Sequence, residues 1–488
     1  MTRQFEHLYL TPKEDFRVAL LSDLKIAQQQ PGQGLNLKAL AERKQLNYST
    51  VYHSYTRLLK DLAAMSGSQS AAPATIMTTS EAELSWYFVQ QSVPYQLLSH
   101  LLANDLQNFD EFLRLTTFSR VTVLRRLQAL RQLARSLKVR IIYETMQMVG
   151  SESAIRIFLT VAFGEATQGC AWPFASVSRP QAARLVAQMY EQVDLDFHNP
   201  IVQESQTYLA AVTIARIQLG MWQNDIPETI TTPVSNFFEL DRRLTKTAQI
   251  AESQVMFLLN VLTAVYTGPR DPQVMVMLMN QTHFDPAIRG FVKRIIQQLP
   301  KALILRADSA LPLQPLIEAS LLASVVGVVI LGYDVSDILA CQLNRNLMQT
   351  PADPALQAAV REACNRAADE VVVPKAVGKH FSAIVKAVYA NSLQLRRYLA
   401  PARPVKVGLM LAPIALQYVD LLAFLTSQAA VQIVDVRTQP CDILIVASAL
   451  PMLANHAPSA IVIHWQPKRA QALMNQLFTL IQKLQHQQ

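Results

Sequence analysis

Residues 110–140 constrain the fold of this chain more than any other stretch. They read DEFLRLTTFSRVTVLRRLQALRQLARSLKVR. Phe112, Leu113 and Leu115 give a first short helix an apolar side, and residues 116–118 predict a break. Ser119 then predicts the start of a second, longer helix, because its hydroxyl can accept a hydrogen bond from the free amides of the next turn. The apolar residues of that second helix recur at helical spacing: Val121, Leu124, Leu127, Leu130 and Leu137.

The remaining faces of this stretch are basic, and no acidic residue lies between Arg114 and Arg140. In a helix-turn-helix the start of the second helix enters the DNA major groove, and basic side chains beside it neutralise phosphates. A solvated basic helix in a bundle is the alternative that this stretch alone leaves open. The candidate DNA contacts are Ser119, Arg120, Thr122, Arg125 and Arg126.

Residues 15–62 predict another helix-turn-helix. A short helix, LKALAERKQL, would turn Leu37, Leu40, Ala41 and Leu46 inward, and Asn47 would end the turn and cap the next helix. That next helix carries an apolar stripe of Val51, Tyr55, Leu58, Leu59 and Leu62. Its exposed early part would offer a second set of DNA contacts: Ser49, Thr50, Tyr52, His53 and Arg57. Any small three-helix core can mimic this pattern, so its place ahead of a second such module is the stronger signal.

Residues 63–80 are small and polar and predict either a flexible linker or a degenerate wing with residues 75–78 as one strand. From about residue 163 to residue 403 the pattern is nearly all helical, and its length suits two successive bundles. After Pro404 apolar strands alternate with helices: strands at 405–411, 431–436, 442–447 and 460–464, and helices at 413–427 and 467–484. This alternation predicts a small parallel α/β domain. The fold class is therefore mostly α and multidomain.

Composition narrows the class of protein. The 488 residues are 51% hydrophobic and 16% charged, with a net charge of +8 and a pI of about 9.3, which suits nucleic-acid binding. The cysteines (Cys170, Cys341, Cys364 and Cys441) are far apart, so we expect neither a metal site nor disulfides, and the pattern suits a reducing cytoplasm. The N-terminus lacks an apolar segment of signal-peptide length. The most apolar run, Ala319 to Tyr333, is flanked by acidic residues and short for a bilayer, so we interpret it as a buried core helix and expect no membrane partner.

A short strand (Val139 to Ile142) follows the basic stretch, and then a Gly-x-Glu-x-x-Ile-Arg-x-Phe segment: Gly150, Glu152, Ile155, Arg156 and Phe158. This order, with another helix-turn-helix upstream, resembles the Mga/AtxA family of bacterial virulence and carbohydrate-responsive transcription regulators. The resemblance implies five domains: a (winged) helix-turn-helix at 1–64, the Mga-type helix-turn-helix at 65–162, two bundles similar to PTS-regulation domains at 163–300 and 301–402, and a domain similar to enzyme IIB of the sugar phosphotransferase system (PTS) at 403–488.

The resemblance also implies a function. The chain would be a cytoplasmic regulator whose partners are double-stranded promoter DNA, a second copy of the chain and PTS phosphocarrier proteins. In that family, histidines of the bundles accept phosphate, a charge switch that can recruit arginines or repel a neighbouring surface. The candidates here are His198, His380 and His283, each of which could equally be an ordinary surface or capping residue. Enzyme IIB carries a phosphate-accepting cysteine after its first strand, where this chain reads LMLAPIALQ, so we interpret the last domain as catalytically silent and used for dimerisation.

The sequence contains none of the common enzyme motifs, such as GxSxG, a Gly-rich phosphate loop or HExxH. We expect no enzyme activity, no cofactor and no bound metal. Glu152 and Arg156, four residues apart on a predicted helix, are most simply an ion pair. Three alternatives stay open: a phosphotransfer component of the PTS, an RNA-binding antiterminator with PTS-regulation domains, and a regulator whose bundles bind a small molecule. The missing cysteine argues against the first, and the helical N-terminus argues against the second.

Overall fold

The computed structural model contains two compact units, which are described separately: one of residues 1–298, 312–351 and 361–388, and one of residues 299–311, 352–360 and 389–488. The structure describes residues 8–28, 36–68, 73–191, 200–223, 236–239, 241–262, 272–299, 313–333, 353–395, 404–411, 418–428, 431–447, 460–466 and 470–486. His198 and Cys341 lie outside the described residues.

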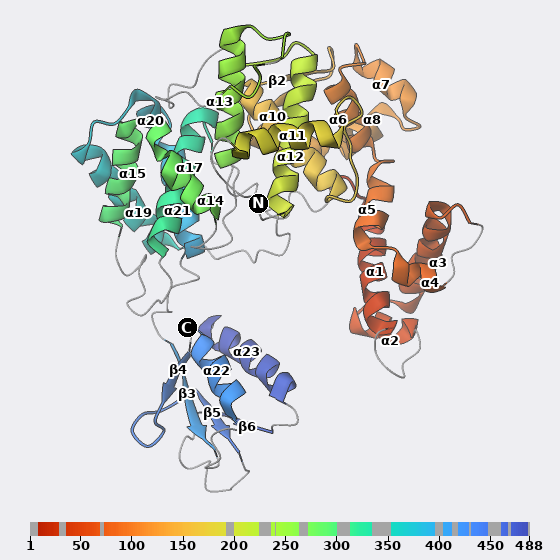
Figure 1. Cartoon of the computed structure of the whole chain (residues 1–488). Helices are drawn as coiled ribbons and strands as arrows, with labels where there is room; N and C mark the ends of the chain where they lie inside the picture. The colour runs from red at the N-terminus through yellow and green to blue at the C-terminus, as the bar shows by residue number, and fades with distance from the viewer. Residues whose placement is uncertain are drawn as a thin grey trace. The chain divides into compact units, whose positions relative to one another are not determined.

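The first unit begins with a helical module (Figure 1). Its elements are α1 (Pro12–Gln28), α2 (Leu37–Arg43), α3 (Tyr48–Met65), α4 (Pro73–Thr78) and α5 (Glu81–Val89). Leu20, Leu24, Val51, Leu58 and Leu62 are fully buried in one core, as the apolar stripe of α3 predicts. The strand considered at 75–78 is wrong, because α4 occupies this segment and buries Ile76 in the same core.

A second module follows, and its last helix packs against helices that come later in the chain. Its elements are α6 (Val93–Ala103), α7 (Phe109–Leu115), α8 (Arg120–Arg126), α9 (Gln128–Ser136), β1 (Arg140–Ile142), β2 (Gln147–Val149) and α10 (Glu152–Thr167). The two strands pair antiparallel, with Arg140 opposite Val149 and Ile142 opposite Gln147. α10 is buried on nearly all sides, and Phe158 and Phe163 fill the core it shares with α6, α9 and α12.

The elements described between residues 179 and 395 are helices. They are α11 (Arg179–Glu191), α12 (Pro200–Gln218), α13 (Lys246–Leu262), α14 (Pro272–Met279), the 3₁₀ helix η2 (Asn280–His283), α15 (Pro286–Gln298), α17 (Leu313–Leu331), α19 (Pro354–Glu370), α20 (Lys375–Lys379) and α21 (Phe381–Leu395). α17 packs against α13, α14, α15 and α20.

α17 contains the most apolar run of the sequence. Within the described part of the chain, its segment Gln314–Leu331 is the one helix long and apolar enough to cross a bilayer, and 61% of that segment is buried inside the unit. The core helices of globular proteins have the same length and composition. The burial therefore agrees with the interpretation of Ala319 to Tyr333 as a core helix.

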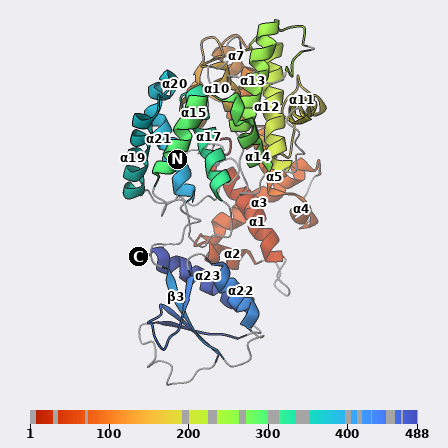
Figure 2. The same ribbon diagram turned by 60° about the vertical axis from the view of Figure 1, so that its left-hand side comes forward.

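The second unit contains a parallel four-stranded sheet in the order β4-β3-β5-β6. Its strands and helices are β3 (Val405–Met410), α22 (Val419–Ser427), β4 (Val431–Val434), β5 (Ile443–Val446), β6 (Ile461–His464) and α23 (Ala470–His486). Alternating residues of β5 point to opposite faces. Ile443 and Ile445 pack with Leu421 of α22 and Leu477 of α23, so both helices cover one face of the sheet (Figure 1 and Figure 2). The predicted parallel α/β domain is confirmed.

Candidate nucleic-acid interface

α8 is the second of two short helices, α7 and α8, that are joined by a short turn. Residues 116–118 separate it from α7, and the Thr116 hydroxyl donates to the carbonyl of Leu113 at 3.0 Å, which closes the end of α7. The hydroxyl oxygen of Ser119 accepts the Thr122 amide at 3.4 Å, so the predicted N-cap is confirmed. Val123 is fully buried, and Ser119 and Arg120 are exposed. The first turn of α8 therefore packs on the core through Val123 and exposes Ser119 and Arg120 to solvent.

The predicted long helix after Ser119 is divided in two at Leu127. Leu127 has φ −81° and ψ −2°, a tighter turn than the α-helix, and it ends α8 and begins α9. Val123, Leu127 and Leu130 are all fully buried, so both short helices pack on the core through residues spaced as on one helix face.

Three residues predicted to face the core do not. Val121, Leu115 and Leu46 are 77%, 59% and 40% exposed. Each lies in or beside a helix of about two turns, which reaches its core through one or two residues: Val123 in α8, Phe109 with Phe112 in α7, and Leu40 with Ala41 in α2. Val121, Leu115 and Leu46 are therefore left at the surface.

Arg120 is held in place by two interactions. Its Nη1 lies 3.0 Å from Oδ1 of Asp110, and its guanidinium lies 5.3 Å from the centre of the Phe109 ring. Both charged side chains are more than half exposed. Among the described basic residues between Arg114 and Arg140, only Arg120 pairs with a carboxylate. The others present an unneutralised positive surface.

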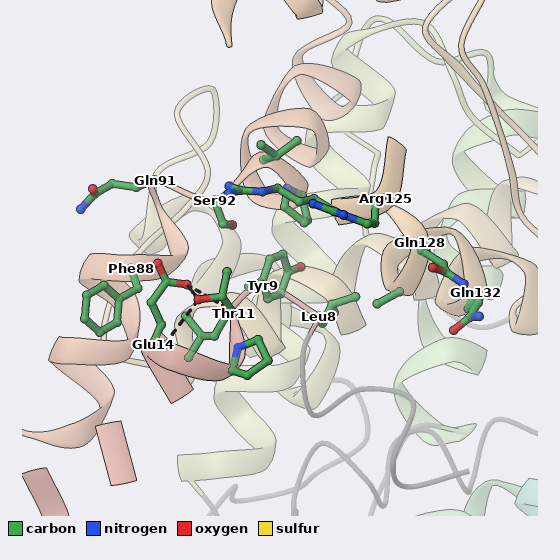
Figure 3. Close-up of a pocket in the computed structure, with 16 residues that line it drawn as sticks. Leu8, Tyr9, Thr11, Glu14, Phe88, Gln91, Ser92, Arg125, Gln128 and Gln132 are labelled. Atoms are coloured by element: carbon green, nitrogen blue, oxygen red, sulfur yellow. Dashed lines mark hydrogen bonds between the residues drawn. The ribbon is translucent and has the colours of Figure 1, made fainter. Parts of the chain in front are cut away.

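Arg125 and Arg126 lie at the opposite end of α8 from Ser119. The guanidinium of Arg126 stacks over the Phe118 ring at 3.8 Å. Both arginines line a pocket of about 430 Å³, whose other walls come from residues 8–14, from residues 88–94 and from α9 (Figure 3). The structure thus brings Ser119, Arg120 and Thr122 together at the start of α8, and the Arg126 side chain reaches back from the other end of the helix to Phe118, the residue before Ser119.

The β1–β2 hairpin adds a wing that the sequence reasoning missed. Its first strand was expected, but its second was not, because the turn at 143–146 (YETM) contains no Gly, Pro or Asn. Met146 supplies the turn instead, with φ 48° and a buried side chain. The turn is fixed to α7, since the amide of Phe109 donates to the Tyr143 carbonyl at 3.1 Å. Arg140 is exposed on this wing and is a functional candidate that only its basic charge could have signalled.

The candidate residues of the first module gather on one helix. Ser49, Thr50, Tyr52, His53 and Arg57 are all exposed on α3. The ring of Tyr52 stacks on that of Tyr48 at 5.9 Å. Arg57 and Arg17 both face Asp61, with N–O distances of 3.4 and 2.8 Å, and burial raises the pKa of the Asp61 carboxyl above its usual range. Asn47 precedes α3, but its side chain accepts no capping hydrogen bond; Asn36 does so for α2, from the amides of Lys38 and Ala39.

Two of the three candidate histidines, His283 and His380, lie among the described helices. His283 ends η2, half-buried, with its ring 6.1 Å from that of Phe257. His380 lies between α20 and α21 and is half-buried against Gly332, the residue after α17. Among the residues that the structure describes, no group of three or more His, Cys, Asp or Glu side chains could hold a metal ion.

Two short helices joined by a tight turn, a capped and exposed second helix, and a β-hairpin beside them define a winged helix-turn-helix domain. Residues 78–163 match the family model of the Mga helix-turn-helix domain. The chain therefore contains an Mga helix-turn-helix domain, which supports a DNA-binding transcription regulator of the Mga type. A search of curated proteins found no match to the chain.

Proposed function

We propose that this protein is a cytoplasmic transcription regulator, without enzyme activity, that binds promoter DNA through the start of α8 and the β1–β2 wing. The observation that carries the proposal is the exposed, capped first turn of α8 inside the matched Mga domain. The major groove is about 12 Å wide and admits an α-helix, whose diameter with side chains is about 10–12 Å. Thr122 and Arg120 would approach base edges, and the wing's Arg140 would contact the phosphate backbone.

The exposed face of α3 supplies a second contact in this proposal. Ser49, His53 and Arg57 are spaced by four residues and share one side of the helix. Arg57 pairs with Asp61, as Arg120 pairs with Asp110, so ion pairing does not separate the two contacts. We assign α8 the stronger contact because α8, unlike α3, lies inside the matched Mga domain.

Promoter binding can be tested with the full-length protein and long native fragments, including the region upstream of its own gene. The variant Arg120→Ala/Thr122→Ala should lose about tenfold or more in affinity, because a good base contact contributes about 1–3 kcal/mol. The control is Arg361→Ala, an exposed arginine of α19 outside the proposed surface. Equal affinity of all three proteins would contradict the assignment of α8.

Regulation through the helical layers rests on a family property and on one structural observation. His380 follows a short helix and packs against the end of the buried α17, so a phosphate on its ring would place a dianion against a core helix. Phosphotransfer with purified general PTS proteins, read by mass spectrometry, should label His380 in the native chain and leave His380→Ala unlabelled at that position. His198 and His283 are the other two candidates, and labelling of none of the three would contradict this part of the proposal.

Dimerisation through residues 403–488 is supported by exposed apolar side chains of the second unit. β6 is an edge strand, and its Ile461 and Val462 are 42% and 40% exposed; Phe478 of α23 is 47% exposed. An edge strand with apolar side chains is a template for pairing with a second copy. Ile461→Lys/Val462→Lys should convert a dimer to a monomer in analytical ultracentrifugation, and an unchanged dimer would contradict this interface.

A further inference from the structure

The pocket at the end of α8 is built from three segments that are far apart in the sequence. Arg125 and Arg126 come from α8, Thr11 and Glu14 from the start of α1, and Ser92 from the start of α6. Figure 3 shows Arg125, Gln128 and Gln132 on one side of the space and Thr11, Glu14 and Phe88 on the other. Its volume of about 430 Å³ is within the range of small-molecule sites.

The charges of this pocket favour an anion. No carboxylate among the described residues pairs with Arg125 or Arg126. Glu14, the acidic residue of the lining, already accepts hydrogen bonds from the Thr11 amide at 2.7 Å and the Thr11 hydroxyl at 2.8 Å. α1 and α6 also begin at this pocket, and the start of a helix carries a partial positive charge.

Part of the remaining lining is apolar and suits an organic group attached to the anion. Leu8, Phe88, Val93 and Ala129 line the same pocket as the two arginines. Each of the two guanidinium groups can bind phosphate oxygens through paired hydrogen bonds. We propose that this pocket binds a small organic phosphate, with the phosphate on Arg125 and Arg126 and the organic part against the apolar wall.

A ligand in this position would connect the two helix-turn-helix modules. Residues 8–14 lead into α1 of the first module, and the Tyr9 hydroxyl donates to the Ala162 carbonyl of α10 at 2.6 Å, which fixes this segment to the second module. The ligand would add a bridge from the same segment to α8. Arg125 and Arg126 are then ligand-binding residues, whereas the start of α8 remains the DNA surface.

The test is isothermal titration calorimetry of the full-length protein with phenyl phosphate, in the absence of DNA, with phenol and inorganic phosphate as partial probes. We expect a dissociation constant of about 1 mM or below for phenyl phosphate, as for a ligand of this size, and weaker binding of either partial probe. Arg125→Ala/Arg126→Ala should weaken binding about tenfold or more, because charge-assisted hydrogen bonds are lost. Arg135→Ala removes an exposed arginine of α9 outside the pocket and should leave binding unchanged.

A second variant separates binding inside the pocket from attraction to a basic surface. Ala129→Phe fills the space from α9 and keeps every charge, so it should abolish binding while circular dichroism shows the native helix content. Three outcomes would each overturn the proposal. Phenyl phosphate could still bind the Ala129→Phe variant, Arg135→Ala could weaken binding as much as the double variant does, or the native chain could give no heat of binding at the highest phenyl phosphate concentration used. None of these outcomes bears on promoter binding, because the titration contains no DNA.

Discussion

The guanidinium of Arg156 on α10 donates two hydrogen bonds to the carboxylate of Glu252 on α13, at 2.5 and 2.8 Å, and both side chains are fully buried. Nε of Arg156 also donates to Glu152 at 3.1 Å, as the sequence spacing predicts, and Glu152 in turn accepts two hydrogen bonds from Arg216 of α12. Two positive and two negative side chains thus form one network. It joins α10, which belongs to the matched Mga domain, to the helices that follow that domain.

Removing one charge from this network should be far more costly than removing one from the surface. Glu252→Gln leaves Arg156 without its buried counter-charge, and breaking such a pair costs about 3–5 kcal/mol. The matched control is Glu204→Gln, which breaks the half-exposed Arg179–Glu204 pair (2.6 Å) and should cost about 0–1 kcal/mol. Hydrogen exchange of the α10 and α13 amides measures the free energy of opening in each variant. Similar losses in the two would contradict a structural role for the buried network.

Asp110 should restrain DNA binding. It holds Arg120 at 3.0 Å and places a negative charge beside the proposed phosphate path. Asp110→Asn should therefore raise DNA affinity about two- to tenfold at low salt, as expected for one exposed charge near the backbone. Fluorescence anisotropy with a labelled promoter fragment measures this change. If Asp110→Asn weakens binding as much as Arg120→Ala does, then Asp110 orients Arg120 for DNA and does not compete with it.

Substitutions at Ser119 can separate helix stability from DNA affinity. Ser119→Ala removes the N-cap of α8 and should cost about 1 kcal/mol of local stability. Ser119→Asp keeps a capping oxygen but adds a negative charge at the DNA surface. We expect normal hydrogen-exchange protection of residues 123–126 in Ser119→Asp together with reduced DNA affinity. Intact DNA affinity in that variant would place the first turn of α8 away from the phosphates.

Alkaline pH should destabilise the helical layer around Tyr208. Burial raises the pKa of the Tyr208 hydroxyl to about 12, and this hydroxyl donates to the Ala171 carbonyl at 2.7 Å. Because the folded pKa exceeds the unfolded value of about 10, the contribution is fully present below about pH 10 and is lost as pH rises through about 12. The stability difference between the native chain and Tyr208→Phe should therefore shrink across this window in urea denaturation. A constant difference from pH 9 to pH 12 would contradict it.

Local patterns in the sequence predicted the local structure well. Ser119 marks the start of α8 because a cap depends only on the next few residues, and the strands of the second unit follow from continuous apolar runs such as DILIVA. The contacts that the sequence could not predict join distant segments. Arg156 meets Glu252 96 residues later, and the pocket combines residues 8–14 with α8. No pattern within one helix specifies such partners.

The break at Leu127 and the wing show a second limit. Leu127 has high helix propensity, so no residue at this position predicts a break. The wing depends on Met146 at positive φ, a conformation that Gly, Asn or Asp would have signalled and Met does not. The sequence therefore identified the start of α8 as a candidate site, but it could not place Arg140 on a hairpin that is tied to α7.

The salt dependence of promoter binding tests the central claim most directly. We would compare the native chain with Arg120→Ala/Arg140→Ala and with Arg361→Ala/Lys386→Ala, which removes two exposed positive charges from α19 and α21. Each lost phosphate contact lowers the slope of log affinity against log salt by about 1. We predict that the slope falls by about 1–2 in the first variant and stays unchanged in the second. Equal slopes in all three proteins would show that DNA does not bind at α8 and the wing.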